Sequence, residues 1–367
     1  MSGTVLIAGA SGLVGSAAGI AFLQAGWDVV AVARRPPELI EAMAGRAPGR
    51  YTHLPIDLRD PQGCRDAAAR LGAVTHVIYA AVYEMPGLVE GWTDPHQIET
   101  NGRMIRNLME PLADSARLEH VTLLQGTKAY GGHFQPMRVP AREDRPRVEH
   151  PNFYWLHEDF VREQSAQRGY AFTIFRPQLI VGPNHGVVMN LPPVIGLYAA
   201  IRRAEGKPFS FPGGAEWVWE AVDTRLIARA ALWAARAPEA ANETFNLTNG
   251  EVFSFRDMWP AMARTLGVET GPDEPISLAR YLPEREDLWR AIVAEHGLRD
   301  IPMTALLGES HHYADLCFAY GAEQPPAPTY LSTVKIKQAG FTDTWNTEES
   351  FCYWLNDLMD RRILPPA

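Results

Sequence analysis

The strongest constraint on the fold is a glycine-rich turn near the start of the chain, where an apolar strand runs into an apolar helix. The run 5–8 precedes Gly9-Ala10-Ser11-Gly12-Leu13-Val14-Gly15, and apolar helical sequence continues to about residue 26. In such a turn the first glycine permits the sharp bend, the second lets the backbone approach a pyrophosphate, and the third lets helix and strand pack closely. Although the spacing is G-x-x-G-x-x-G, its place between strand and helix predicts a dinucleotide site. We expect this site to include Gly9, Ser11, Gly12, Leu13, Val14 and Gly15.

The end of the next apolar run indicates which dinucleotide binds. Residues 28–33 have the pattern of a strand, and Arg34-Arg35-Pro36 follows its end. A site for NAD usually has an acid there to hold the ribose 2′-hydroxyl, whereas arginine suits a 2′-phosphate through forked, charge-assisted hydrogen bonds. We therefore predict NADP(H), with Arg34 and Arg35 on the phosphate. The alternative is that both arginines are solvated loop residues.

Two further strand ends are expected to contact the cofactor. A third strand is predicted at 52–56 and is followed by Asp57-Leu58. Asp57 either accepts a hydrogen bond from the adenine amino group or caps the next helix. A fourth strand is predicted at 76–81, and the small side chains of Ala80 and Ala81 would let the nicotinamide ribose lie close to the backbone.

Composition restricts the class of protein. With 367 residues, 46% of them hydrophobic, the chain can bury a large core and is too long for one nucleotide-binding unit. The net charge of −9 argues against nucleic acid as a partner. The three cysteines suggest a reducing cytoplasm without a disulfide framework. We expect a cytoplasmic protein, because the first strand begins too early for a signal peptide and no apolar run approaches the roughly 20 residues that cross a bilayer. No histidine or cysteine spacing indicates a metal site.

Strand and helix patterns alternate up to about residue 180, which predicts a doubly wound parallel sheet of the Rossmann type. Further strands are expected at 120–124 and 171–175, with helices at 99–115 and 153–168 among those between them. Beyond residue 180, helical stretches near 194–205, 223–237, 255–266 and 284–295 suggest a mostly helical cap. A strand at 243–247 could return to the sheet. We expect an NADP-binding domain at 1–180 and a substrate-binding cap at 181–367, with segments of the cap returning to the sheet.

Two motifs resemble those of one enzyme family. Gly126-Thr127-Lys128-Ala129-Tyr130-Gly131 follows the fifth strand, and Asn152-Phe153-Tyr154-Trp155-Leu156-His157-Glu158-Asp159 opens the next long helix. Together with the glycine turn and 33–36, they resemble the progesterone 5β-reductase and iridoid synthase-like group of short-chain dehydrogenases. The resemblance continues through 176–177, 189–190, 211–213 and 245–246. Ordinary short-chain dehydrogenases carry Tyr-x-x-x-Lys, whereas here Glu158 stands four residues after Tyr154.

This resemblance implies NADPH-dependent reduction of a C=C bond next to a carbonyl, with hydride added to the β-carbon. A tyrosine hydroxyl, helped by a lysine, stabilises the enolate oxygen. Lys128 matches the family lysine. The family motif normally has two tyrosines, of which the second is catalytic, and that position is Trp155 here. Tyr154 has therefore taken over, or Trp155 lines the pocket while Lys128 or Tyr130 polarises the carbonyl, or the reduction is lost or altered. We favour Lys128 and Tyr154 as the catalytic pair.

The resemblance also suggests the remaining contacts. The cofactor residues would further include Gly126, Lys128, Tyr154, Pro177 and Ile180, and the substrate pocket would include Tyr130, Trp155, Met189 and Asn190. The expected substrate is a small apolar molecule with a conjugated carbonyl, and a homodimer is left open. A carbonyl reductase or extended short-chain epimerase or dehydratase, and a non-catalytic NADPH sensor, are the competing functions.

Overall fold

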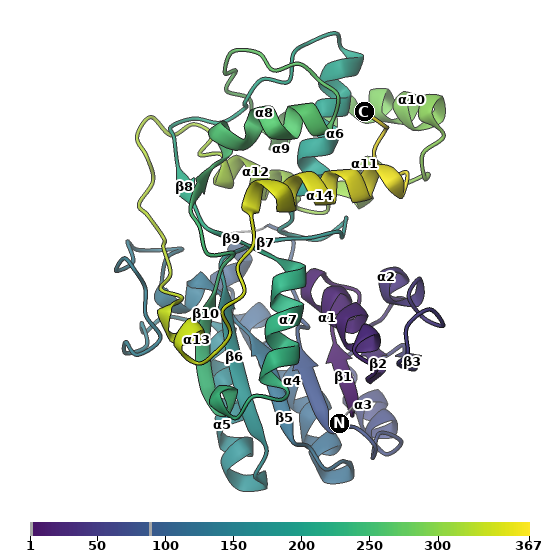
Figure 1. Cartoon of the computed structure of the whole chain (residues 1–367), viewed down its shortest axis with the longest axis vertical. Coiled ribbons are helices and arrows are strands. Elements are labelled where there is room, and N and C mark those ends of the chain that lie inside the picture. Colours follow the sequence, from purple (N-terminus) through teal and green to yellow (C-terminus); the bar gives the residue numbers. More distant parts are fainter. Residues whose placement is uncertain (1–2, 88–89) are drawn as a thin grey trace. The chain divides into compact units, whose positions relative to one another are not determined.

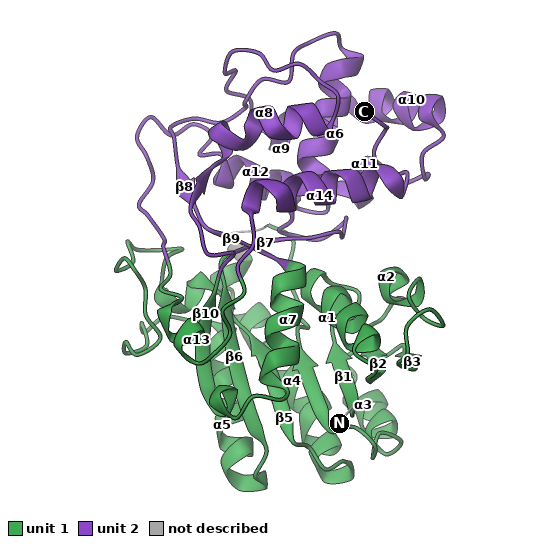
Figure 2. Cartoon of the chain, viewed as in Figure 1, with its two compact units in different colours: residues 1–178, 224–247, 331–343 green, residues 179–223, 248–330, 344–367 purple. Residues whose placement is uncertain are grey.

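The computed structural model describes residues 3–87 and 90–367 and divides the chain into two compact units (Figures 1 and 2). Unit 1 comprises residues 1–178, 224–247 and 331–343, and unit 2 comprises 179–223, 248–330 and 344–367. The first boundary falls two residues before the expected one. Two later segments, 224–247 and 331–343, belong to the first unit.

Unit 1 is built on a seven-stranded sheet in the order β10-β6-β5-β4-β1-β2-β3, and every neighbouring pair is parallel. The predicted Rossmann sheet is therefore confirmed, including the return of the strand at 243–247. Strand order reverses between β1 and β4, which is where this fold class binds ligands. The strands are β1 (Thr4–Ala8), β2 (Asp28–Val32), β3 (Tyr51–Leu54), β4 (His76–Tyr79), β5 (His120–Leu124), β6 (Ala171–Pro177) and β10 (Glu243–Leu247).

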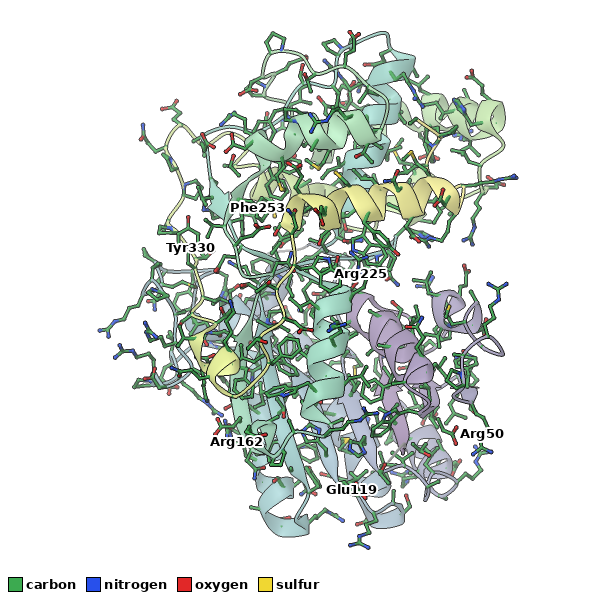
Figure 3. The ribbon with its side chains drawn as sticks, in the orientation of Figure 1. Arg50, Glu119, Arg162, Arg225, Phe253 and Tyr330 are labelled. Carbon is green, nitrogen blue, oxygen red and sulfur yellow. The ribbon has the colours of Figure 1, made fainter. Side chains whose placement is uncertain are left out.

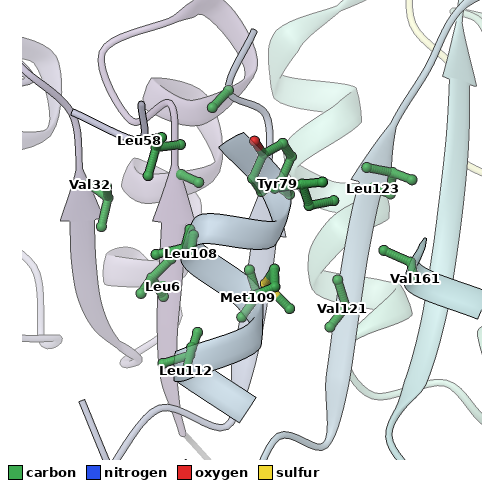
Figure 4. Packing of buried hydrophobic residues seen from close by; sticks show 14 of the residues in the cluster. Leu6, Val32, Leu58, Tyr79, Leu108, Met109, Leu112, Val121, Leu123 and Val161 are labelled. Carbon is green, nitrogen blue, oxygen red and sulfur yellow. The ribbon is translucent and has the colours of Figure 1, made fainter. Parts of the chain in front are cut away.

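Apolar side chains cover both faces of this sheet, as continuous apolar runs in parallel strands require. On one face, Leu6 and Tyr79 pack with Leu108 and Val161 from two covering helices (Figure 4). On the other, Val5 and Ile7 pack with Phe22 and Ala231. The helices of unit 1 are α1 (Leu13–Gln24), α2 (Glu38–Glu41), α3 (Pro61–Ala68), η1 (Glu90–Thr93), α4 (Pro95–Ser115), η2 (Thr127–Tyr130), α5 (Phe153–Arg168), α7 (Thr224–Ala234), η3 (Pro238–Ala240) and α13 (Val334–Gln338).

Several of these helices begin at side chains that cap them. Asp60 caps α3 and Asp94 caps α4, and proline is the first helical residue in both. Asn152 caps α5 by accepting a hydrogen bond from the Tyr154 N–H at 3.0 Å. These caps fix where α4 and α5 start, and so fix the residues that the first turn of α5 presents.

Unit 2 is mostly helical, as expected for the cap, with two small two-stranded sheets. One prediction was wrong: the helix expected at 223–237 is α7, which belongs to unit 1 and packs on α1. Its buried face, which includes Ala231, joins the core beside Phe22, so this apolar stripe covers the sheet. Unit 2 contains β7 (Leu179–Val181), α6 (Leu191–Ala204), β8 (Val218–Trp219), β9 (Ala221–Asp223), β11 (Phe253–Ser254), α8 (Phe255–Thr265), α9 (Leu278–Tyr281), η4 (Pro283–Arg285), α10 (Glu286–His296), α11 (Met303–Leu307), α12 (Ser310–Cys317) and α14 (Thr347–Asp360).

The described residues include neither a membrane-spanning helix nor a cluster of metal ligands. None of the described helices is both long enough and apolar enough to cross a membrane. Within residues 3–87 and 90–367, no three histidine, cysteine, aspartate or glutamate side chains are grouped so that they could hold a metal ion.

Candidate active site

The glycine turn lies at the point where the strand order reverses. Gly9 has a φ of +83°, and a Cβ there would lie 2.7 Å from the Ala81 nitrogen, so only glycine allows the end of β1 to approach the end of β4. A Cβ on Gly15 would overlap the Gly9 carbonyl oxygen. A Cβ on Gly12 would approach only that oxygen, at 3.3 Å, and would otherwise project into open space. Gly9 and Gly15 are therefore needed for packing, while Gly12 leaves the start of α1 open to a ligand.

Arginines gather beyond β2 and β3. Arg34 and Arg35 are both exposed directly after β2. Asp57 does not cap α3, since Asp60 does; its carboxylate is instead gripped by Arg59 at 2.6 Å. The hydrogen bond from Arg59, with a smaller contribution from the charge of Arg34, lowers the pKa of Asp57 to about 2. The sequence analysis did not identify Arg59 as the partner of Asp57, although the two residues are only two positions apart.

The two predicted catalytic side chains lie on adjacent elements of unit 1. Lys128 is in η2, just beyond β5, and the neighbouring Ala129 packs against Phe153 and Tyr154 in the first turn of α5. Tyr154 is buried, and its hydroxyl would lie 3.2 Å from a Cβ on Gly126. That Cβ would also lie 3.5 Å from the Pro177 carbonyl oxygen. A side chain at Gly126 would therefore press on the Tyr154 hydroxyl, and glycine leaves that hydroxyl room.

The Lys128 ammonium lies in unusually apolar surroundings. Its Nζ is 3.9 Å from the centre of the Trp92 ring, which provides a cation–π contact. Burial lowers the pKa of Lys128 to about 8, against the opposing effect of the Glu84 carboxylate. Burial, followed by the negative charge of Glu84, raises the pKa of Tyr154. Glu84 thus acts on both predicted catalytic groups, although no motif drew attention to it.

Aromatic rings extend from Trp92 along one side of this region. His133 lies edge-on to Trp92, with ring centres 6.0 Å apart, and also contacts Phe134 and His150. Burial lowers the pKa of His133 to about 4, so the ring is neutral near pH 7. Among the described residues, neither His133 ring nitrogen nor the Trp92 Nε1 has a hydrogen-bond partner. These buried polar atoms are available to a ligand, and sequence reasoning missed both residues.

Glu158 stands four residues after Tyr154, the position at which ordinary short-chain dehydrogenases carry lysine. Its carboxylate belongs to a network of hydrogen bonds and ion pairs. Its carboxylate accepts a hydrogen bond from the Gln125 Nε2 at 2.8 Å and pairs with Arg176 at 3.4 Å, Arg147 at 3.1 Å and Arg162 at 2.9 Å (Arg162 is labelled in Figure 3). Burial opposes ionisation, but these donors and charges lower the pKa of Glu158. The Gln125 amide also donates to the Tyr154 carbonyl oxygen at 3.3 Å. The network therefore ties the first turn of α5 to the end of β5.

Trp155 and Tyr130 differ in their burial and in their hydrogen bonds. Trp155 is half-buried, with the Arg147 guanidinium 4.8 Å from its ring centre and His150 at 5.8 Å, and its Nε1 has no partner among the described residues. Tyr130 was expected in the substrate pocket, but its buried hydroxyl donates to the Asn246 Oδ1 at 2.6 Å and its ring lies under Arg176. Because Asn246 is itself fully buried, its Oδ1 requires a donor, and the Tyr130 hydroxyl supplies it.

Other predicted contacts also have structural explanations. The Leu58 side chain is part of the core on the α4 side of the sheet (Figure 4), so only its backbone could face a cofactor. Ile180, Met189 and Asn190 belong to unit 2. Asn190 was expected to line the substrate pocket, but its fully buried amide accepts from the Gly182 N–H and donates to the Gly182 and Asn184 carbonyls. Its hydrogen-bonding capacity holds that loop together.

The sequence and the structure of this chain are similar to those of known proteins. Residues 61–305 match the model of the PRISE-like Rossmann-fold domain. The chain is 30% identical over 381 residues to an (S)-8-oxocitronellyl enol synthase of Antirrhinum majus, covering 98% of this chain and 92% of that protein. It is 31% identical over 357 residues to a 3-oxo-Delta(4,5)-steroid 5-beta-reductase of Arabidopsis thaliana, covering 92% and 86%. It also resembles the structure of a Thermus thermophilus UDP-glucose 4-epimerase in complex with NAD, with a TM-score of 0.64 and 19% identity over 96% of this chain and 98% of that one.

The fold and the sequence matches define the class of protein. The sheet, its strand order and the glycine turn are those of the short-chain dehydrogenase/reductase superfamily. Within that superfamily the chain belongs to the PRISE-like Rossmann-fold family, since the family model covers more than half of its length. The expected family resemblance is therefore confirmed.

Proposed function

We propose that this chain is an NADPH-dependent reductase of C=C bonds conjugated to a carbonyl. The observation that carries the proposal is the placement of Lys128 and Tyr154 on adjacent elements beside an apolar, aromatic-lined region. The relatives named above include a steroid 5-beta-reductase, whose name specifies a 3-oxo-Delta(4,5) steroid, a conjugated enone. The expected substrate is a small, largely apolar molecule with a conjugated carbonyl.

The residues of the glycine turn fit the proposed cofactor. Gly12 leaves open the start of α1, where backbone N–H groups and the helix dipole favour a pyrophosphate. Arg34 and Arg35 follow β2 where an acid would favour NAD, and both are exposed for a 2′-phosphate. The backbone of Ala80 and Ala81 lies against Gly9, and the small size of both residues suits the close approach of a cofactor. When bound, the reduced nicotinamide supplies the hydride that adds to the β-carbon of the substrate.

The roles of the two catalytic residues follow from where negative charge develops. As the β-carbon gains hydride, the carbonyl oxygen becomes an enolate oxygen. The Tyr154 hydroxyl donates a hydrogen bond to that oxygen, and its raised pKa keeps it protonated as a donor. The Lys128 ammonium supplies a positive charge nearby, and both act more strongly in apolar surroundings than in water. The neutral rings of Trp92 and His133 form one wall of the proposed substrate site.

The test is NADPH oxidation measured with paired substrates, namely a conjugated enone and the corresponding saturated ketone, with identification of the product. A C=C reductase consumes NADPH only with the enone and yields the saturated ketone. Consumption with the saturated ketone would indicate a carbonyl reductase. Tight NADPH binding without turnover of any enone would contradict the proposal and favour the sensor function. An epimerase would show no net consumption.

Substitutions of Tyr154 and Trp155 test which of these two neighbouring residues is catalytic. Losing one enolate-stabilising donor costs about 10²–10³-fold in kcat at comparable sites. Tyr154→Phe and Lys128→Met are each expected to lose about that much. Trp155→Phe is expected to lose far less, because its ring packs against Arg147 and His150. Tyr320→Phe, at an exposed tyrosine of unit 2, is the matched control and should keep full activity. A full loss in Trp155→Phe with none in Tyr154→Phe would reverse the assignment.

A further inference from the structure

The charge of Lys128 is held by an aromatic ring and not by an acid. The Lys128 Nζ lies 3.9 Å from the centre of the Trp92 ring, well inside the roughly 6 Å over which a ring face attracts a cation. Among residues 3–87 and 90–367, the structure shows no hydrogen bond or ion pair of this ammonium. Because a lysine side chain is long and flexible, a contact at its end decides where its charge lies.

The backbone around Trp92 is fixed by the start of α4. Trp92 lies in η1, and the Asp94 carboxylate that follows caps α4 by accepting from the His96 and Gln97 N–H groups at 2.8 and 3.1 Å. The Asp94 N–H donates to the Gly91 carbonyl oxygen at 3.3 Å, which closes the turn that contains Trp92. A Cβ on Gly91 would lie 2.7 Å from the Gln97 Oε1, so this turn lies directly against α4. The indole therefore extends from a turn that a long helix supports.

Neighbouring rings restrict the orientation of the indole. The His133 ring meets Trp92 edge-on, with 81° between the planes and 6.0 Å between the centres. His133 also contacts the rings of Phe134 and His150, each with centres 5.0 Å apart. His150 is held in turn by Asn152, whose Nδ2 donates to the His150 Nε2 at 3.0 Å. The indole is thus supported by α4 and by these rings, and its face is presented to Lys128.

Few other charged or titratable groups act on Lys128. Burial lowers the pKa of Lys128 to about 8, and the negative charge of Glu84, from the segment beyond β4, opposes that effect. His133 is neutral near pH 7, because burial lowers its pKa to about 4. Tyr154 on α5 is also uncharged, since burial raises its pKa. On β6, the Arg176 guanidinium is paired with a carboxylate of α5 at 3.4 Å. The indole contact therefore acts on an ammonium that is close to losing its proton near neutral pH.

We propose that Trp92 is a positioning residue for Lys128: the face of its indole binds the ammonium and holds it, in its charged form, where the enolate oxygen develops. This inference rests on the proposed reductase function and adds to it the group that places the positive charge. A carboxylate partner would cancel much of the field of the ammonium. The uncharged indole holds the ammonium and leaves its net positive charge to act on the enolate.

The test weakens the attraction of the ring with little change in its size. Fluorine withdraws electron density from the ring face, so mono-, di-, tri- and tetrafluorotryptophan in place of Trp92 bind a cation progressively less strongly. The pKa of Lys128 is measured by NMR of the Cε atoms of isotopically labelled lysines. The chain has four lysines, and Lys128→Arg identifies the signal that belongs to residue 128. We expect the pKa of Lys128 to fall stepwise from about 8, by about one pH unit in total, which is a tenfold change in proton affinity.

Enone reduction by the same proteins shows whether the contact serves the reaction. Activity is lost as pH rises through the pKa of Lys128, so a lower pKa should move that loss to lower pH by the same amount along the series. Trp92→Phe keeps a ring face and should retain part of the effect. The matched control is the same fluorinated series at Trp233, whose ring packs on Phe245 and Phe341, and it should change neither readout.

Three outcomes would overturn the inference. An unchanged pKa of Lys128 along the series would refute the contact, and so would equal changes in the series at Trp233. A pKa that falls while the pH profile of turnover stays in place would show that the contact does not serve the reaction. Failure of the wild type to reduce any enone would instead refute the proposed function, whereas the NMR series would still decide whether Trp92 binds the ammonium.

Discussion

Replacing Glu158 by alanine tests whether the buried charge network holds the first turn of α5. Arg176 is only 6% exposed, so removing its carboxylate partner leaves a buried charge that lacks compensation. Breaking a buried pair in this way costs about 3–5 kcal/mol. Arg147 and Arg162 are partly exposed, and their pairs add less than about 1 kcal/mol each. Because Arg176 keeps its hydrogen bond to the Gln125 Oε1, we expect the lower end, about 3 kcal/mol.

The assay is thermal unfolding followed by near-ultraviolet circular dichroism. For a chain of 367 residues, with an unfolding entropy of about 2.1 cal/mol/K per residue, a loss of about 3 kcal/mol corresponds to a fall of roughly 4 °C in Tm. The matched control is Glu163→Ala on the exposed side of α5, where the carboxylate bonds only to Gln167 among the described residues, and it should change stability by less than about 0.5 kcal/mol. Equal shifts in the two variants would refute the argument from burial.

The pH dependence of the stability difference between the wild type and Glu158→Ala gives a second check. The pKa of Glu158 is lowered in the folded protein, so its contribution is present above the ordinary carboxyl value of about 4.5 and is lost as pH falls below it. The stability difference between wild type and Glu158→Ala should therefore be full at pH 7 and shrink in acid. A difference that persists unchanged well below pH 4 would show that the carboxylate charge is not its source.

Four further variants or conditions test other parts of unit 1. Arg35→Asp should weaken NADPH relative to NADH in steady-state kinetics, and an unchanged preference would contradict the cofactor assignment. Gly15→Ala should abolish cofactor binding measured by titration, because the new methyl group would displace α1 from the end of β1. Asn152→Ala should cost about 1 kcal/mol in urea unfolding through loss of the α5 cap, whereas Asn152→Asp should retain it. Enone reduction should decline as pH rises through about 8, where Lys128 loses its proton, and Lys128→Arg should remove that decline.

The sheet could be predicted from sequence because its signals are local. The central strands, such as β1 and β2, are short apolar runs bounded by turn residues, and the Gly9 turn identifies the first of them. The assignment of the helix at 223–237 to the cap was wrong for the same reason, because the signal that predicts a helix is local. An amphipathic helix carries the same apolar stripe whether it covers a sheet or forms a cap. The sequence of 224–234 could not reveal that its partner is Phe22 on α1, about 200 residues earlier.

The candidate site was less predictable, because its electrostatics come from residues outside the motifs. Lys128 and Tyr154 could be picked out by motif, but the motif alone directed the catalytic role to Trp155 or Tyr154 without deciding between them. Which side chain faces Gly126 depends on where α5 starts, and the Asn152 cap sets that start. Glu84 and Trp92 stand in a segment without a recognisable pattern, and only the fold brings them to Lys128.

Glu158 carries a negative charge where ordinary short-chain dehydrogenases have a positively charged lysine, and this difference links these observations. In ordinary short-chain dehydrogenases a lysine four residues after the tyrosine lies one helical turn along the same face, where it can support the tyrosine. Here that position is a carboxylate turned into a network with Arg176 and Gln125, so it cannot supply positive charge to the Tyr154 hydroxyl. In the proposed mechanism the positive charge therefore comes from another element, through Lys128 of η2. The two differences therefore depend on each other: restoring lysine at 158 would place a cation beside Arg176, so Glu158→Lys should destabilise the protein more than Glu158→Ala and should not rescue Lys128→Met.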